Sequence, residues 1–345
     1  MKKFGGLTLY KNKPTIIAEA GVNHDCDIRK ANKLISDAKS CGVDAIKFQT
    51  YKSKDLVIKN SPAYWDLTKE KSKSQRKLFD KYDKFNFKEY LKLIKQCKKK
   101  KITFLTTLFD IQSIPLFSKY LPLFKITSAD ITNVPLLKAI SSQKKPILLS
   151  TGASQIDEIK FALRTLKLPK EQVCIMHCVL NYPTKDENAN LKFIEVLKKK
   201  FNKYTIGYSD HVSPDKNLTS LEVAWNYGAQ IIEKHFTYNK NKKGNDHYHS
   251  ADKNDFIKFY ERIKKIEMLK GNGFKDLRKE KNSIMYARRS IVSKKKINKG
   301  DYLNSKNLTT KRPGIYISAK NWEKVIGKRA KRNIKFDTPI YYDDF

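Results

Sequence analysis

Two lysines of this 345-residue sequence lie inside otherwise hydrophobic runs, where a charged side chain is uncommon. Lys47 belongs to the run 44–50 and Lys125 to the run 123–130, and both runs also contain hydroxyl side chains. Burying an ammonium group is costly unless an anion meets it. Lysine and hydroxyl donors together suit phosphate and carboxylate oxygens. The sequence therefore predicts a site for a phosphorylated, carboxylated small molecule.

Two histidines stand near the ends of consecutive hydrophobic runs in the second half of the chain. His211 and His235 occupy equivalent places in these runs. If the chain folds as a barrel, as argued below, these two imidazoles lie at one mouth of it. Two imidazoles placed in this way can hold a divalent metal and leave positions open for substrate oxygens. A pair of hydrogen-bonded core histidines has the same spacing, so the spacing leaves both interpretations open. His247 and His249 in the next loop are alternative ligands.

Two acids, Glu19 and Asp130, also lie near the ends of hydrophobic runs. Carboxyl groups in such places can move protons or contact sugar hydroxyls. Salt bridges to Lys47 or Lys125 are the alternative, and the residue types alone do not choose between these roles.

The elements that must position these side chains alternate between short β-branched runs and amphipathic stretches. Eight strand–helix units within about 260 residues are typical of a (β/α)8 barrel. An open doubly wound sheet is the alternative, although no G-x-G-x-x-G opens a helix. The predicted strands are 15–21, 44–50, 102–109, 123–130, 146–152, 173–182, 204–210 and 231–237. The predicted helices are 28–41, 87–99, 111–121, 134–142, 155–166, 191–201, 220–227 and 255–270.

Two segments depart from this alternation. Residues 52–85 form a long polar insert, and long loops in compact domains are usually functional. The composition also changes near Gly271. We therefore expect a barrel domain at 1–270, a linker at 271–282, and a small domain at 283–345 that docks onto another surface.

The amino-acid composition argues against several classes of protein. The formal net charge is +37, which invites a nucleic-acid interpretation, but only ten of the 72 cationic residues are Arg. Lysines spread along the chain suit a solvated surface better than base recognition, so we expect no nucleic-acid partner. No apolar stretch is long enough to span a bilayer and no signal peptide is evident, so we expect a cytoplasmic protein. The five cysteines form no C-x-x-C pair and are typical of reduced thiols.

Several of these motifs together resemble the sialic acid synthase family, and the C-terminal sequence resembles its antifreeze-like SAF domain. The likeness covers the chain from about residue 15 to the C-terminus, with motifs in order at nearly every predicted strand. The motifs are 16–24 (IIAEAGVNH), 47–50 (KFQT), 125–130 (KITSAD), 150–152 (STG), 182–184 (YPT), 207–211 (GYSDH), 233–237 (EKHFT) and 311–314 (KRPG).

The resemblance implies a TIM barrel followed by a SAF domain. It implies an enzyme that condenses phosphoenolpyruvate with an N-acylated six-carbon sugar and water to a nine-carbon 2-keto acid and phosphate. It also implies a divalent metal, Mn or Mg, at His211 and His235, which would polarise the sugar aldehyde. Glu19 and Asp130 match acids near the reacting carbons. The implied phosphoenolpyruvate-binding residues are Lys47, Lys125, Ser128, Ser150 and Ser209, and the implied sugar-binding residues are Gln49, Tyr182, Asp246 and Arg312.

Arg312 lies outside the barrel, and the resemblance implies a domain-exchanged homodimer in which one SAF domain caps the other subunit's barrel. Three features depart from the family pattern: Asp130 in place of Glu, Leu180 in place of a polar residue, and the histidines at 247 and 249. These leave N-acetylmannosamine and a 2,4-diacetamido-trideoxyhexose as nearly equal acceptor sugars. Another phosphoenolpyruvate-dependent keto-deoxy sugar synthase and a basic nucleic-acid-binding protein are the rival functions.

Overall fold

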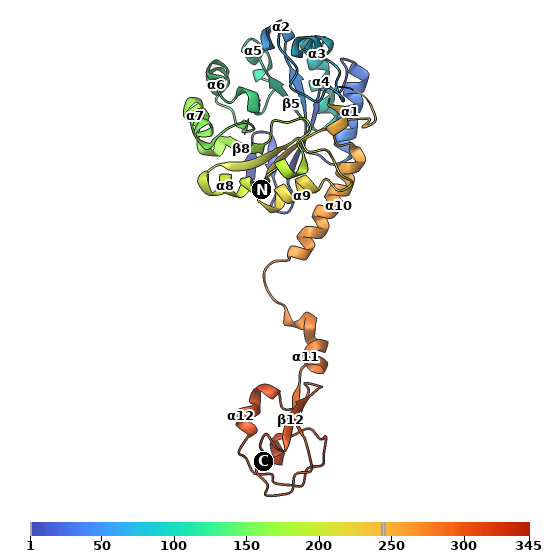
Figure 1. Ribbon diagram of the computed structural model, residues 1–345, viewed down its shortest axis with the longest axis vertical. Coiled ribbons are helices and arrows are strands. Elements are labelled where there is room, and N and C mark those ends of the chain that lie inside the picture. The colour runs from blue at the N-terminus through green and yellow to red at the C-terminus, as the bar shows by residue number, and fades with distance from the viewer. Residues whose placement is uncertain (1, 243, 245) are drawn as a thin grey trace. The chain divides into compact units, whose positions relative to one another are not determined.

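The computed structural model describes residues 2–242, 244 and 246–345. The chain forms two compact units, Met1–Lys270 and Gly271–Phe345, which are described separately (Figure 1). Among the described residues, no helix is both long and apolar enough to cross a membrane.

The first unit is built on eight parallel strands in the order β5-β4-β3-β10-β9-β8-β7-β6. The end strands β5 and β6 lie next to each other, so the sheet is nearly closed. This confirms the predicted TIM barrel over the open sheet. The strands are β3 (Thr15–Gly21), β4 (Ala45–Thr50), β5 (Thr103–Leu108), β6 (Phe124–Ile126), β7 (Ile147–Ser150), β8 (Val173–Cys178), β9 (Thr205–Asp210) and β10 (Ile231–His235).

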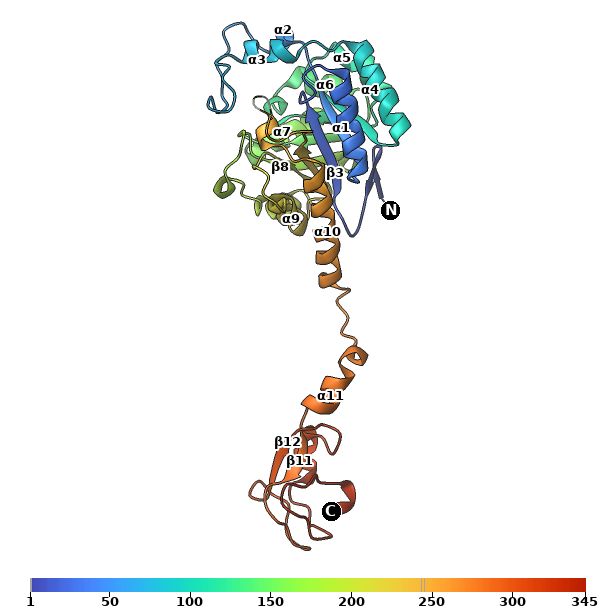
Figure 2. The same cartoon turned by 90° about the vertical axis from the view of Figure 1, so that its right-hand side faces the viewer.

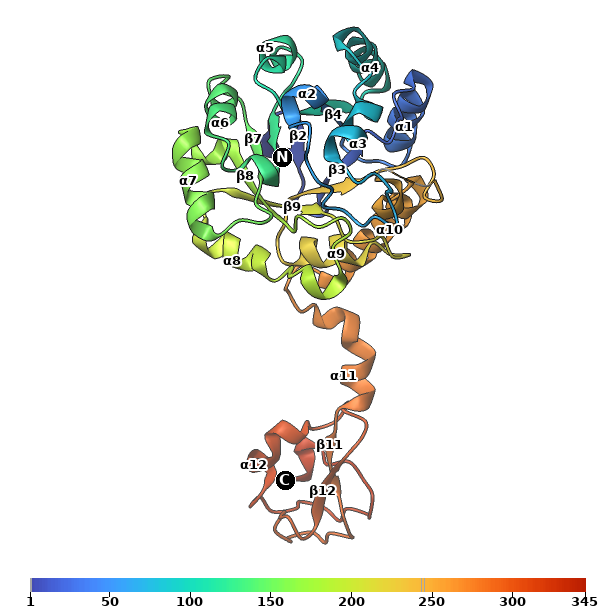
Figure 3. The same cartoon turned by 45° about the horizontal axis from the view of Figure 1, so that its top comes forward.

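A helix follows each strand and covers the outside of the barrel (Figure 3). Helix α1 shows why these segments are helical. Asp27 accepts a hydrogen bond from the Arg29 backbone at its start, and buried residues recur at helical spacing from Ala31 to Ala38. The helices are α1 (Ile28–Ser40), α4 (Phe87–Lys100), α5 (Ser113–Ser118), α6 (Val134–Ser141), α7 (Ile156–Leu166), α8 (Phe193–Lys200), α9 (Thr219–Asn226) and α10 (Lys253–Lys270).

The fourth barrel strand is shorter than the predicted strand 123–130. β6 ends at Ile126, and Ser128–Asp130 forms a 3-10 turn. The Thr127 hydroxyl donates to Asp130, and Asn133 caps α6 by accepting from the Leu136 backbone. These local hydrogen bonds compete with strand pairing and turn the chain out of the barrel.

The bottom of the barrel is closed by an N-terminal hairpin that the sequence interpretation missed. β1 (Lys2–Phe4) and β2 (Leu7–Leu9) pair antiparallel. Phe4, Leu7 and Leu9 pack in one buried cluster with barrel residues such as Ile17 and Leu148. The open mouth of the barrel is therefore the carboxyl-terminal one, where the polar strand ends lie.

The insert 52–85 contains two short helices, α2 (Ser53–Leu56) and α3 (Gln75–Tyr82), which lie in front of the barrel strands in Figure 3. Asp83 fixes the start of α2 by accepting from Lys52 and from the backbone and side chain of Ser53. The Trp65 indole donates to the backbone oxygens of Glu70 and Ser72. The insert is thus an ordered segment, and Figure 2 shows it at one end of the barrel.

The second unit has a small core of its own, made by residues such as Ile291, Leu308 and Ile340. Its ordered elements are α11 (Lys281–Ala287), the antiparallel strands β11 (Ser290–Ser293) and β12 (Leu308–Lys311), and α12 (Trp322–Val325). Gly271 and Gly273, at its start, have positive φ angles of 61° and 80°, which favour glycine.

Candidate active site at the carboxyl-terminal mouth of the barrel

All five residues predicted to bind phosphoenolpyruvate line one cavity at the barrel mouth. The strand register explains the gathering, because Lys47 of β4 pairs with Glu19 of β3, and Glu19 pairs in turn with His235 of β10. The full lining is Glu19, Lys47, Gln49, Thr107, Lys125, Thr127, Ser128, Ser150, Cys178, Tyr182, Ser209, His211, Glu233 and His235.

Both interior lysines face carboxylates of the protein itself. The Lys47 ammonium lies 2.6 Å from Glu19 Oε2, and that of Lys125 lies 2.7 Å from Glu233 Oε1. Lys47 also donates to the Thr107 hydroxyl at 2.8 Å. Of the two roles left open for Glu19, the salt bridge to Lys47 is present. Each of the two lysines therefore has a carboxylate partner before any ligand arrives.

Glu233 is a site residue that the sequence interpretation missed. Its Oε1 accepts from Lys125 and from the Ser209 hydroxyl, while its Oε2 has no hydrogen-bond partner among the described residues. The signal was present in the sequence: alternation along β10 turns Glu233 and His235 to the same side of the sheet. The Glu233 carboxylate therefore competes with any anionic ligand for the lysines.

Burial and neighbouring charges shift the pKa values of Glu233 and Glu19 in opposite directions. Burial by itself would raise the pKa of Glu233, but the charges of Lys125 and Lys47 outweigh it and lower that pKa to about 2. Burial raises the pKa of Glu19 despite the nearby Lys47. Two carboxyl groups whose pKa values are pushed apart suit an anion and a proton carrier. Glu19 is thus the group that can hold a proton.

Asp130 is not brought into this cavity. Its Oδ2 accepts from the Thr127 hydroxyl at 2.7 Å, and its Oδ1 accepts from the Asn133 amide at 3.2 Å. In the described part of the chain, Asp130 lines neither of the two barrel-mouth cavities. Its visible role is to hold the turn between β6 and α6.

His211 and His235 lie together as predicted, with ring centroids 5.4 Å apart. His211 Nδ1 donates to the Val179 carbonyl at 2.7 Å in the tautomer that leaves its Nε2 lone pair free. Burial lowers the pKa of His211 to about 3, which keeps the ring neutral. A neutral imidazole with a free lone pair is a competent metal ligand.

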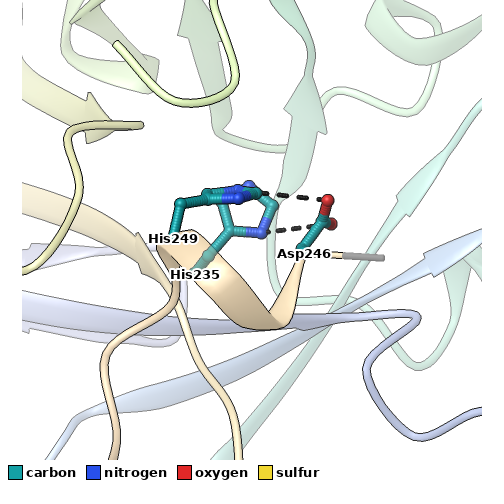
Figure 4. A group of neighbouring side chains, drawn as sticks. All are labelled: His235, Asp246 and His249. Atoms are coloured by element: carbon teal, nitrogen blue, oxygen red, sulfur yellow. Dashed lines mark ion pairs between the residues drawn. The ribbon is translucent and has the colours of Figure 1, made fainter. Parts of the chain in front are cut away.

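The loop after β10 adds a carboxylate and a third ring to these histidines (Figure 4). Asp246 Oδ2 lies 3.3 Å from His235 Nδ1, and Asp246 Oδ1 lies 3.9 Å from His249 Nε2. His247, the other loop histidine, points elsewhere and shares a hydrogen bond with Thr237 at 2.7 Å. One ligand atom from each of His235, Asp246 and His249 lies within 4.8 Å of the others, so these three residues could hold a metal ion, and the His211 ring lies beside that of His235.

A second cavity, rich in aromatic residues, adjoins the first. Gln49, Thr127, Tyr182 and His235 line both cavities. Three residues predicted to bind sugar, Gln49, Tyr182 and Asp246, line this second cavity. Its other lining residues are Val22, Tyr51, Leu56, Tyr64, Trp65, Glu70, Leu78, Phe79, Tyr82, Phe109, Thr127, Ala129, Leu180, His235 and Tyr248. Arg312, the fourth predicted sugar ligand, is exposed in the second unit.

A buried ion pair joins β9 and β10 next to His211 and His235. Lys234 Nζ lies 2.8 Å from Asp210 Oδ2, and both side chains are fully buried. Asp210 also accepts from the Tyr208 and Ser220 hydroxyls and from the Val212 backbone. Because Asp210 precedes His211 and Lys234 precedes His235, this network holds the backbone next to both histidines.

Known proteins resemble this chain over most of its length. The sequence profile of the NeuB family matches residues 34–275, and that of the SAF domain matches residues 288–345. N,N'-diacetyllegionaminic acid synthase of Campylobacter jejuni is 39% identical, over 95% of this chain and 99% of the relative. N-acetylneuraminate-9-phosphate synthase of Drosophila melanogaster is 29% identical, over 94% of each chain. The crystal structure of N-acetylneuraminic acid synthetase from Leptospira borgpetersenii in complex with citrate superposes with a TM-score of 0.70 at 31% identity, and covers 81% of this chain and 95% of that chain.

Proposed function

The chain belongs to the NeuB family and ends in a SAF domain, and from this premise we propose that it condenses phosphoenolpyruvate with an N-acylated six-carbon sugar. The products are a nine-carbon 2-keto acid and phosphate, so the protein is a nonulosonic acid synthase. One observation carries the proposal: a lysine- and serine-lined cavity adjoins a cavity rich in aromatic residues, and the two share lining residues that include Gln49, Tyr182 and His235. This arrangement suits an anionic donor beside a less polar acceptor.

The anion cavity would hold phosphoenolpyruvate through Lys47, Lys125 and the serine hydroxyls. C3 of phosphoenolpyruvate then forms a bond to the sugar aldehyde carbon, water adds to C2, and phosphate leaves with cleavage of its C2–O bond. Glu19 is the residue we assign to proton transfer, because burial raises its pKa and its side chain lines the anion cavity. Asp130 stays a weaker candidate for this role, since local hydrogen bonds engage both of its oxygens.

We further propose a divalent ion, Mn or Mg, at His211 and His235. The fit rests on donor chemistry: both rings are buried, and His235 Nδ1 has no hydrogen-bond partner among the described residues. When bound there, such an ion would supply polarisation of the aldehyde oxygen. Tyr182, whose ring centroid lies 4.2 Å from that of His211, closes one side of this position.

For the acceptor, we favour a 2,4-diacetamido-trideoxyhexose over N-acetylmannosamine. Tyr64, Trp65 and Phe79 of the insert and Leu180 of the loop after β8 give the acceptor cavity apolar walls. An acetamido methyl and a deoxy carbon bury favourably against such walls, whereas the extra hydroxyls of N-acetylmannosamine would need partners there. The 39% identity to a diacetyllegionaminic acid synthase supports the same choice.

We also propose a cytoplasmic, domain-exchanged homodimer, with a barrel domain at 1–270, a linker at 271–282 and a capping domain at 283–345. Support comes from Arg312, an exposed cation in the small unit that has no partner among the described contacts, and from the SAF match. In this arrangement, Arg312 of one subunit would reach the acceptor in the other subunit's barrel.

The test is to incubate the protein with phosphoenolpyruvate, Mn²⁺ and a panel of N-acyl hexoses, and to measure phosphate release and product mass. We expect release with the diacetamido sugar, and loss of release in Lys47→Met. Lys160→Met is the matched control, because that lysine lies on the barrel surface with a single exposed ion pair. Failure to release phosphate with every sugar would refute the proposal.

A further inference from the structure

His249 is completely buried, yet neither nitrogen of its ring has a hydrogen-bond partner in the described part of the chain. Leaving a buried polar atom without a hydrogen bond costs free energy, so such groups call for an explanation. His247, two residues earlier and equally buried, does have a hydrogen bond, to Thr237. The lack of partners is therefore particular to His249.

The turn that carries His249 is firmly held. Ser250 donates to the Asp246 carbonyl, and Asn23 of the first strand–helix loop donates to the Ser250 hydroxyl. Tyr248 donates to the Tyr182 carbonyl at 3.1 Å. The imidazole is thus aimed by fixed neighbours, and its orientation belongs to the fold rather than to a free loop.

The Nε2 atom of His249 faces the Asp246 carboxylate. Figure 4 shows the His235 and His249 rings on one side of the Asp246 carboxylate. One ligand atom from each of the three residues lies within 4.8 Å of the others. Two ligands at about 2.1 Å from one ion lie about 3.0 to 3.5 Å apart. The separations from Asp246 are near this range, 3.3 Å from its Oδ2 to His235 Nδ1 and 3.9 Å from its Oδ1 to His249 Nε2, and the 4.8 Å limit within the group leaves at most about 1.3 Å of closure.

We propose that His249 is a third imidazole ligand of the divalent ion, beside His211 and His235, with Asp246 as the carboxylate ligand. This inference rests on the proposed metal-assisted function and adds to it the loop 246–249 as part of the metal site. Imidazole ligands favour Mn²⁺, Co²⁺ and Zn²⁺ over Mg²⁺, which prefers oxygen. The site therefore selects a transition metal against Mg²⁺.

The test measures metal binding directly. Metal-free protein is titrated with Mn²⁺ by electron paramagnetic resonance, and pulsed measurements count the nitrogens bound to the ion. Wild type should show three. His249→Phe, which keeps a ring of similar volume, should show two and bind Mn²⁺ at least tenfold more weakly. His177→Gln is the matched control, since this buried imidazole lies on β8 and bonds the Ala189 carbonyl.

His249→Gln provides a second variant in case the phenylalanine disturbs folding, which circular dichroism would show. An unchanged nitrogen count and affinity in either folded variant would overturn the inference. If wild type makes product while His249→Phe keeps full Mn²⁺ affinity, the ligand assignment alone fails. If wild type binds Mn²⁺ through three nitrogens yet forms no product with any sugar, the proposed function alone fails.

Discussion

Replacing Glu233 by Gln should make the protein less stable and at the same time better at binding phosphate. The side chains of Lys47, Lys125 and Glu233 are 3%, 4% and 6% exposed, so water screens their charges little. Glu233 Oε1 lies 2.7 Å from Lys125 and 3.7 Å from Lys47. The variant keeps an oxygen acceptor at this position but removes its negative charge. The positive charges of Lys47 and Lys125 are then only partly compensated.

The magnitudes follow from this geometry. Removing one partner of a buried ion pair costs about 3–5 kcal/mol, and because Gln retains a neutral hydrogen bond we expect a loss of about 3 kcal/mol. For the ligand, a carboxylate about 5 Å from a bound phosphate repels each unit of its charge by about 3 kcal/mol at an effective dielectric of about 20. Allowing for relaxation, Glu233→Gln should bind inorganic phosphate at least tenfold more tightly.

Urea unfolding measures the first quantity and isothermal titration with phosphate measures the second. Because the pKa of Glu233 is held at about 2, its carboxylate is ionised throughout assays at about pH 5–8, so the affinity gain should grow over that range only as phosphate itself becomes doubly charged. Glu222→Gln is the control, since this acid pairs with Arg262 on the outer surface. Weaker or unchanged phosphate binding in a folded Glu233→Gln would refute the charge-balance reasoning.

Two further predictions concern stability. Burial lowers the pKa of His24 to about 4 from an ordinary 6.5, so the unfolded chain takes up a proton first, and up to about 3 kcal/mol of stability should be lost as the pH falls from 6.5 to 4. His24→Gln should flatten this part of the pH profile of urea unfolding, and an equally steep profile would contradict the assignment. Leu7→Ala should cost about 3 kcal/mol by opening a cavity under the barrel, whereas Leu277→Ala, at an exposed position, should change the urea midpoint little. Equal midpoints in the two variants would show that the hairpin does not plug the barrel.

Much of the barrel was predictable because its elements are local. Buried residues recur every three to four positions in α1, and β-branched runs mark each strand, so fold class and approximate strand positions follow from periodicity. The fourth strand was predicted too long because Asp130 and Asn133 favour local hydrogen bonds over pairing. The hairpin Lys2–Leu9 was missed because two three-residue strands carry too little pattern to detect.

For the site, too, some features were predictable from the sequence and others depended on tertiary structure. The residue types determined that interior lysines need anions and that two strand-end histidines can bind a metal. Which anion meets which lysine depended on pairing across the closed sheet: Lys125 and Glu233 are 108 residues apart, and the strand register brings them to 2.7 Å. The position of His249 likewise depends on a turn held by Asn23, more than 200 residues away in sequence. The sequence by itself thus determined the strand–helix order and the chemical character of the mouth. Only tertiary structure decided which groups neutralise one another, because contacts between strand ends arise from barrel closure and register, and no local pattern encodes them.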